Sequence, residues 1–210
     1  MSADHGGMKD HWDRLYTEKA STELSWYQPV LTRSLELMRD AAIEKTASII
    51  DVGGGDSTLV DALLAIGFVN ITVLDLSSAA LERSRARIGD AARSVRWVVA
   101  SVLDAGLPPA SADLWHDRAV FHFLTDVAER NAYIEQVRRV VRPGGHVIVA
   151  TFAEDGPASC SGLPVERYSA GRLHSTFGEG FRLLGSERET HHTPAGRDQP
   201  FVYCWCRHDP

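Results

Sequence analysis

A regular alternation of short apolar strands and helical segments begins at residue 47, and it constrains the fold more than any other feature of this sequence. Apolar runs bounded by turn residues predict strands, and apolar residues spaced three and four apart predict helices between them. Strands separated by helices of this length form βαβ units and therefore a parallel sheet. The sequence predicts five such strands, over residues 48–52, 70–74, 95–100, 112–115 and 146–151, with helices over 57–66, 77–89 and 126–141.

The pattern changes near the end of the chain. After a loop rich in glycine and proline and a short helix over 169–177, two further strands are predicted over 181–188 and 199–207. About ten residues separate these strands, which is too few for a helical crossover, so they are expected to pair antiparallel. The prediction is an α/β fold with a mostly parallel seven-stranded sheet and an antiparallel terminal hairpin.

The strongest chemical signal is a glycine-rich turn between the first strand and the helix after it, Asp51-x-Gly53-x-Gly55-x-Ser57. Glycine lets the backbone turn tightly and leaves no Cβ in the path of a ligand, and the following helix presents free backbone N–H groups. Asp75 stands twenty residues after Gly55, at the end of the second strand, where a carboxylate can accept hydrogen bonds from ribose hydroxyls. The pair indicates a nucleoside site at the carboxyl ends of the strands.

Several further motifs identify the kind of nucleoside. A dinucleotide fingerprint requires a third small residue where this chain has Thr58, and the Tyr-x-x-x-Lys pair of short-chain hydride transfer is missing. The glycine loop and Asp75, taken with Leu107-Pro108, Asp113-Leu114 and Arg142-Pro143-Gly144-Gly145-His146, resemble class I methyltransferases over residues 47–151. This resemblance implies a three-layer Rossmann-like fold, S-adenosylmethionine as methyl donor and S-adenosylhomocysteine as product.

The resemblance also implies which residues hold the donor. The glycine loop would lie against its methionine part, the acid after strand two would hold the ribose, and the residues after strand three would bracket the adenine. Asp104 is the alternative to Ser101 as the polar contact of the adenine amino group. The cofactor-binding residues expected in the methyltransferase region are Asp51, Gly53, Gly54, Gly55, Ser57, Asp75, Leu76, Ser101, Val102 and Asp117.

The acceptor is expected at the carboxyl ends of strands four, five and six. Methyl transfer from a sulfonium is a direct displacement, so the protein has to align the acceptor and remove its proton. The candidate catalytic residues are His116, Asp117, His122, His191 and His192, with one histidine as general base. The alternative for His116 is a packed polar residue, and for His122 a structural residue or one at the edge of the cofactor. Asp117 could orient a histidine or contact the amino group of the cofactor, and His191 and His192 could be part of a polar turn. His116, Asp117 and His191 are of the right donor types for zinc or iron, but no short-range ligand spacing supports a site, so no metal is expected.

The segment before the first strand, residues 1–46, is expected to be a helical lid on a methyltransferase domain of residues 47–210. Its aromatic residues Trp12, Tyr16 and Trp26 either cover the sheet or close over the cofactor, where aromatic faces suit a sulfonium cation. His11-Trp12-Asp13-x-x-Tyr16 with Ser25-Trp26-Tyr27 resembles the N-terminal segment of some protein-lysine methyltransferases. That resemblance keeps a protein substrate open.

Composition narrows the range of partners. The formal net charge is −6, and the arginines between residues 83 and 96 are expected to form a solvated helix face, so nucleic acid is not an expected substrate. The start of the chain has no apolar region typical of a secretory signal, and no apolar run is long enough to span a membrane. Cys160, Cys204 and Cys206 form no CxxC pair, which favours reduced thiols and a cytoplasmic location. A monomer or a homodimer is expected.

The function expected from the sequence is therefore methyl transfer to nitrogen, oxygen or sulfur of a small molecule, with a protein-lysine methyltransferase as the alternative. A dehydrogenase-like binder is the remaining alternative. DNA amino-methylation is disfavoured because the motif Asn/Asp-Pro-Pro-aromatic is replaced by His116-Asp117-Arg118-Ala119 after strand four.

Overall fold

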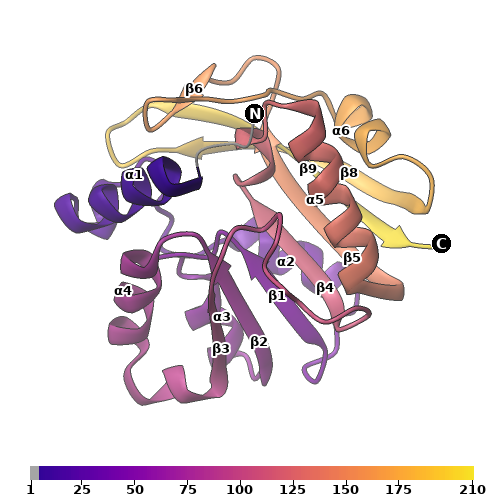
Figure 1. The fold of residues 1–210 in the computed structure, drawn as a ribbon, viewed down its shortest axis with the longest axis horizontal. Helices are drawn as coiled ribbons and strands as arrows, with labels where there is room; N and C mark the ends of the chain where they lie inside the picture. The colour runs from indigo at the N-terminus through magenta and orange to yellow at the C-terminus, as the bar shows by residue number, and fades with distance from the viewer. Residues whose placement is uncertain (1–4) are drawn as a thin grey trace.

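The predicted sheet forms the middle layer of the molecule (Figure 1). The computed structural model describes residues 5–210, and its seven-stranded sheet has the order β3-β2-β1-β4-β5-β9-β8. These strands are β1 (Ser48–Val52), β2 (Asn70–Asp75), β3 (Val95–Val99), β4 (Ala112–Arg118), β5 (Val141–Phe152), β8 (Phe181–His192) and β9 (Asp198–His208). Strands β1 to β5 are parallel, and β9 pairs antiparallel with both β5 and β8. The predicted fold class and terminal hairpin are confirmed.

Helices cover both faces of the sheet, because each helix turns an apolar stripe toward it. One face carries α2 (Thr32–Asp40), α3 (Leu59–Ala65) and α4 (Ser78–Ile88), with Met38, Leu63 and Leu81 in a common core cluster. The other face carries α5 (Val127–Val140) and α6 (Ala170–Phe177), with Val137 and Leu173 in a second core cluster. The result is the expected three-layer arrangement. Short pieces complete the chain: the 3₁₀ helices η1 (Ser21–Glu23), η2 (Gly89–Ser94) and η3 (Phe121–Phe123), and a small ladder of β6 (Ser159–Cys160) with β7 (Leu163–Pro164).

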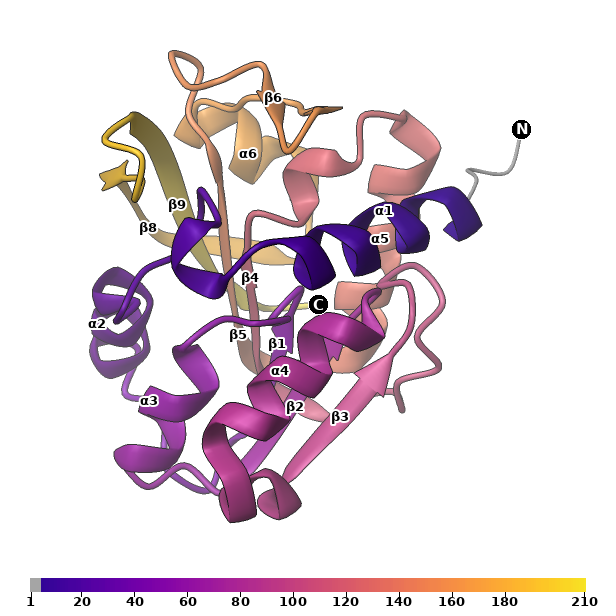
Figure 2. The same ribbon diagram turned by 90° about the vertical axis from the view of Figure 1, so that its left-hand side faces the viewer.

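The first helix, α1 (His5–Glu18), lies outside these layers and crosses the carboxyl ends of β1, β2 and β3 (Figure 2). The Asp13 carboxylate fixes it to the start of α4, where it accepts hydrogen bonds from Ser77 Oγ at 2.6 Å and from the Ala79 backbone N–H at 3.2 Å. A carboxylate is favourable there because a helix N-terminus has unsatisfied N–H groups and a positive partial charge. Arg83 adds a hydrogen bond from α4 to the Lys19 carbonyl at 2.8 Å.

Three predicted boundaries are wrong in ways that concern the site. Strand β4 continues past Trp115 to Arg118, and β8 continues past Arg188 to His192, because neighbouring strands pair with these residues. His191 and His192 therefore belong to a strand and not to a turn. Strand β5 begins at Val141 and includes the predicted Arg142–Gly145 turn, with an irregularity in its pairing to β4. No helix in residues 5–210 is both long and apolar enough to cross a membrane.

Candidate active site

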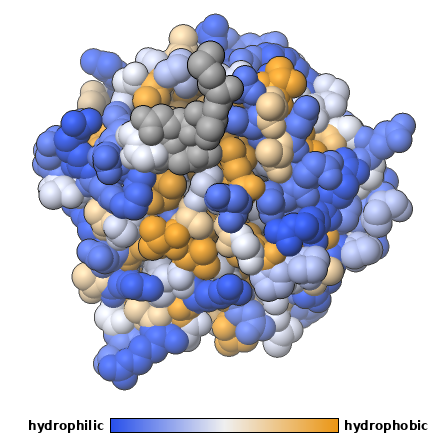
Figure 3. All heavy atoms as spheres, viewed as in Figure 1, coloured by the Kyte–Doolittle hydropathy of each residue, from blue (hydrophilic) through white to orange (hydrophobic). Residues whose placement is uncertain are grey.

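A cavity of about 220 Å³ lies between α1 and the carboxyl ends of β1 to β4. Strand order reverses at this edge, since β1 has β2 on one side and β4 on the other, and open α/β sheets bind ligands at such a point. Apolar side chains gather across the middle of the face that Figure 3 presents. The cavity is lined by Met8, Trp12, Tyr16, Trp26, Val52, Gly53, Leu74, Asp75, Leu76, Ala100, Ser101, Val102, Leu103, Arg118, Ala119, Val120, Phe123, Leu124, Glu129 and Cys160.

The glycine loop passes so close to its neighbours that side chains do not fit. Gly53 has a φ of +63°, and a Cβ on it would lie 2.0 Å from Val120 Cγ2. A Cβ on Gly55 would lie 2.8 Å from Asp75 Oδ2. Glycine at these positions therefore permits the left-handed backbone and also leaves room beside the loop for a ligand. The Gly53 N–H donates to the Leu74 carbonyl at 2.7 Å, which holds the loop against the end of β2.

Asp75 ends β2 and lines the cavity, as predicted. One carboxylate oxygen accepts a hydrogen bond from the Ser77 backbone N–H at 2.7 Å. Burial raises the pKa of Asp75 to about 7, against the hydrogen bonds from the Ser77 and Gly55 backbone that favour the charged form. A ligand whose hydroxyl groups donate hydrogen bonds to this carboxylate would replace the hydrogen bonds from water that burial removes.

A second, smaller cavity of about 40 Å³ adjoins the first on the side of the glycine loop. Both cavities are lined by Tyr16, Trp26, Val52, Gly53 and Arg118, which marks where they meet. The smaller one is otherwise lined by Ser21, Leu24, Tyr27, Gln28, Leu31, Asp51, Gly54, Asp56, Ser57, Thr58 and His116.

Asp51 is buried under the glycine loop, with one oxygen paired and the other free. Its Oδ1 lies 2.8 Å from His116 Nδ1, whereas its buried Oδ2 has no hydrogen-bond partner among residues 5–210. A buried carboxylate oxygen without a partner is costly, so a donor from a ligand would stabilise it. A Cβ on Gly54 would lie 2.5 Å from the same oxygen.

An aromatic cluster from the N-terminal segment forms the roof of the main cavity. Trp12 packs edge-to-face on Trp26 at a centroid distance of 5.8 Å and on Phe123 at 5.2 Å. Tyr16 lies edge-to-face to Trp26 at 5.9 Å. Such packing orders the segment around rings that are suited to a sulfonium cation.

These features fit S-adenosylmethionine. The open glycine loop, the strand-end carboxylate and the orphaned Asp51 oxygen are what its methionine, ribose and amino groups require. Among the predicted cofactor-binding residues, the larger cavity is lined by Trp12, Tyr16, Trp26, Gly53, Asp75, Leu76, Ser101 and Val102, and the smaller by Asp51, Gly54 and Ser57. Gly55 lies beside Asp75 without lining either cavity, and exposed Asp104 lines neither, whereas Ser101 lines the larger one.

His116 does not occupy the position of a general base. Its side chain is 1% exposed, and its two ring nitrogens lie 2.8 Å from Asp51 Oδ1 and 2.9 Å from Ser34 Oγ. Because both nitrogens are engaged inside the protein, neither is free to take a proton from an acceptor. In this geometry His116 connects α2 to Asp51 under the glycine loop.

Asp117 points to the opposite side of β4 and lines neither cavity. Its carboxylate accepts hydrogen bonds from the backbone N–H groups of Val120 and Phe121 and from Tyr133 Oη at 2.6 Å. Burial raises its pKa to about 6, although these hydrogen bonds favour the charged form. These contacts of Asp117 fix the turn after β4.

His122 is buried between aromatic rings. Its ring lies 4.5 Å from that of Phe123 and 4.7 Å from that of Phe152, and its Nδ1 accepts the Phe152 N–H at 3.4 Å. Burial, together with the positive charge of Arg118, lowers the pKa of His122 to about 3. His122 lines neither of the two cavities.

The two histidines at the end of β8 have different surroundings. His191 is 2% exposed and holds the N-terminal segment, with Nδ1 3.0 Å from Gln28 Nε2 and Nε2 2.7 Å from the Ser25 carbonyl. His192 is exposed and lies 2.6 Å from Asp198. Neither lines one of the two cavities described above, so the structure does not bring the predicted histidines together around one cavity.

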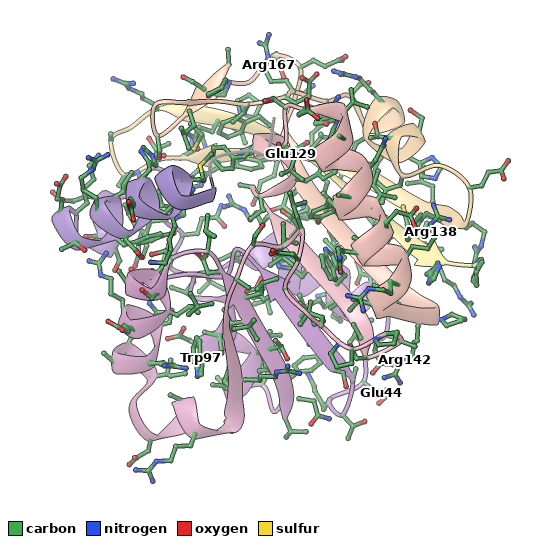
Figure 4. The ribbon with its side chains drawn as sticks, viewed as in Figure 1. Glu44, Trp97, Glu129, Arg138, Arg142 and Arg167 are labelled. Carbon is green, nitrogen blue, oxygen red and sulfur yellow. The ribbon has the colours of Figure 1, made fainter. Side chains whose placement is uncertain are left out.

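The sequence-based assignment missed the residues that complete the main cavity beyond the cofactor positions. Arg118 ends β4, Phe123 lies in η3, Cys160 in β6, and Glu129 in the first turn of α5. Figure 4 shows Glu129 at the end of α5 nearest α1, whereas Arg142 and Glu44 lie at the opposite end of the sheet. A prediction that extended strand four by three residues would have placed Arg118 at the carboxyl edge of the sheet. No sequence pattern pointed to Phe123, Cys160 or Glu129. The described residues contain no cluster of three or more metal-ligating side chains.

Comparison with known proteins agrees with this geometry. A family model described as a methyltransferase domain matches residues 50–149. Human EEF1A lysine methyltransferase 2 is 23% identical over 85% of this chain and 75% of its own length.

Two solved structures show the same fold. A protein from work on the conversion of a disulfide bond into a thioacetal group during echinomycin biosynthesis has a TM-score of 0.75 at 21% identity, covering 96% of this chain and 93% of its own. The 1,6-didemethyltoxoflavin-N1-methyltransferase of Burkholderia thailandensis, which holds S-adenosylhomocysteine, has a TM-score of 0.69 at 18% identity, covering 99% and 87%. The matched methyltransferase domain, the glycine loop and the strand-end acid together support an S-adenosylmethionine-dependent methyltransferase, and its fold is the Rossmann-like fold of class I methyltransferases.

Proposed function

We propose that this enzyme transfers the methyl group of S-adenosylmethionine to nitrogen, oxygen or sulfur of a small molecule that enters the apolar part of the main cavity. The observation that carries this proposal is the continuity of the cavity. It runs from the cofactor positions at Asp75 and Ser101 to a part lined by Met8, Phe123 and Leu124 under α1. A compact apolar acceptor fits such walls, which exclude water from the displacement.

When bound, S-adenosylmethionine supplies a methyl group on a positively charged sulfur. The protein aligns the acceptor behind that methyl group and takes up the proton that the acceptor loses. We assign the proton-accepting role to Glu129 in place of a histidine. Its carboxylate lines the main cavity and has no hydrogen bond or ion pair with any residue of the described chain.

In this proposal the described part of the N-terminal segment, residues 5–46, has the role of a lid, and residues 1–4 lie outside the described residues. Trp12, Tyr16 and Trp26 line the cavity from above, and Asp13 anchors α1 to α4. His191 anchors the following loop through Gln28 and the Ser25 carbonyl.

A protein-lysine methyltransferase is the second candidate. It is favoured by the similarity to EEF1A lysine methyltransferase 2, which extends over 85% of this chain. The roof of aromatic rings and the free carboxylate of Glu129 would also suit a lysine side chain.

The test is to incubate the enzyme with a cell extract and radiolabelled S-adenosylmethionine, and then to separate small molecules from polypeptides. Label in the small-molecule fraction is expected, and Asp75→Asn serves as a control that should give much less label when S-adenosylmethionine is not saturating. Label confined to polypeptides would refute the first candidate and support the second.

Glu129 is tested in the same assay. Glu129→Gln is expected to lower turnover while leaving the affinity for S-adenosylhomocysteine unchanged. Glu135→Gln, on the same helix and paired with Arg138, is the matched control. Equal turnover in the two variants would remove Glu129 from the reaction.

A further inference from the structure

Arg118 is a half-buried cation without a counterion. It ends β4 and lines both cavities at their junction. No carboxylate within residues 5–210 forms an ion pair with it. Tyr203 lies between Arg118 and Glu189: its hydroxyl accepts a hydrogen bond from Arg118 and donates one to Glu189 at 2.9 Å. Half-buried charges without a partner are unfavourable, so a structural role alone explains Arg118 poorly.

The hydrogen bonds of Arg118 use only part of its guanidinium. Nε donates to Tyr203 Oη at 3.1 Å and Nη1 to the Trp26 carbonyl at 3.4 Å, while the guanidinium carbon lies 4.5 Å from the centre of the Phe201 ring. These contacts hold the group in one orientation. Nη2 is buried and has no partner among the described residues, which leaves its two N–H donors for a ligand.

The surroundings of Arg118 are complementary to a zwitterion. The smaller cavity is lined by Arg118, with its free Nη2, and by Asp51, whose buried Oδ2 is also free. These two orphaned atoms carry opposite charges. Asp56, the other acid of this cavity, is already paired with Arg87 and Arg83. An α-amino-acid group would therefore find a donor for its carboxylate and an acceptor for its ammonium group.

We propose that Arg118 binds a ligand carboxylate at the junction of the two cavities. Two sources of this carboxylate are open: the methionine end of S-adenosylmethionine, which the free Asp51 oxygen favours, or an acidic group on the acceptor in the main cavity. Guanidinium suits either because its N–H groups form charge-assisted hydrogen bonds with carboxylate oxygens. The inference about the donor end does not depend on which acceptor the enzyme uses.

The test measures, by calorimetry, the affinity of the full chain for two ligands that differ at the amino-acid end. S-adenosylhomocysteine has this end, and 5′-methylthioadenosine lacks it. Arg118→Met keeps the length of the side chain and removes its charge, and Arg118→Lys restores the charge. Arg142→Met is the matched control, because Arg142 pairs with Asp113 at the far end of the sheet (Figure 4).

If the donor supplies the carboxylate, Arg118→Met should bind S-adenosylhomocysteine about tenfold or more weakly, because a charged hydrogen bond is lost. Its affinity for 5′-methylthioadenosine should be unchanged, and Arg118→Lys should recover part of the loss. If the acceptor supplies it, both affinities stay unchanged. In that case the wild-type complex with S-adenosylhomocysteine should bind benzoate, measured by NMR, and Arg118→Met should lose this binding.

Two results would overturn the proposal. The first is equal weakening of both nucleoside ligands, which indicates a structural role. The second is unchanged binding of all three probes by Arg118→Met. A wild-type chain that binds S-adenosylhomocysteine but labels only polypeptides would refute the small-molecule function and leave this inference standing.

Discussion

Replacing Asp75 by asparagine tests the donor site most directly. The carboxylate ends β2 beside the glycine loop, where it would accept hydrogen bonds from the ribose hydroxyls of the donor. The Asp75→Asn substitution would keep the shape of the side chain and remove its charge. A hydrogen bond to a charged acceptor contributes ~1.5–3 kcal/mol, so the affinity for S-adenosylhomocysteine should fall by roughly one to two powers of ten. Calorimetry that finds an unchanged dissociation constant would refute the assignment.

The raised pKa of Asp75 adds a pH dependence with a definite sign. Because the pKa in the unliganded protein is about 7, roughly a tenth of the carboxyl groups are ionised at pH 6 and nine-tenths at pH 8. The ionised form is the one that accepts hydrogen bonds from both hydroxyl groups, so affinity should rise about tenfold over this range in the wild type and stay flat in Asp75→Asn.

The stability of the unliganded protein should respond to pH in the opposite sense. The folded pKa of Asp75, about 7, lies above the ordinary value of 3.8, so the folded chain holds the proton more tightly than the unfolded chain. The stabilisation from this group is complete below pH 4 and is lost as the pH rises through 7. Unliganded Asp75→Asn should therefore melt above the wild type at pH 8. A wild type that is the more stable of the two at that pH would contradict the pKa assignment.

Three further substitutions test the architecture of the site. Gly53→Ala should lower the free energy of unfolding by ~1–3 kcal/mol in denaturant titrations, because its Cβ would meet Val120 and its backbone is left-handed; wild-type stability would show that the loop adapts. Asp13→Ala should release α1 from α4, seen as faster amide exchange over residues 5–18 with little change in the sheet, and unaltered exchange would refute the anchoring role. His116→Ala should reduce stability by ~1–3 kcal/mol and weaken donor binding through Asp51. Normal stability with lost turnover would instead restore His116 as a catalytic residue.

The sequence by itself determined the fold and the donor half of the site. The spacing of apolar residues differs between strands and helices, so it distinguishes the two within a short segment. The requirement for glycine at a strand-to-helix turn comes from backbone sterics, which also depend only on neighbouring residues. The acid at the end of the second strand follows from chain spacing alone, since parallel neighbours bring their carboxyl ends to one edge. Asp75 and Gly53 could therefore be placed at the site from the sequence alone.

Only the tertiary structure decided which polar side chains face the ligand. His116 and Asp117 are adjacent on one strand, so their side chains point to opposite faces, and each meets partners far away in the chain, Ser34 for one and Tyr133 for the other. Whether the ring nitrogens of a histidine are hydrogen-bonded inside the protein depends on those partners, and the spacing of residues along the chain does not predict them. The same reason explains Arg118 and Glu129: their exposure to the cavity follows from how α1, β9 and α5 pack around them, and not from any local pattern.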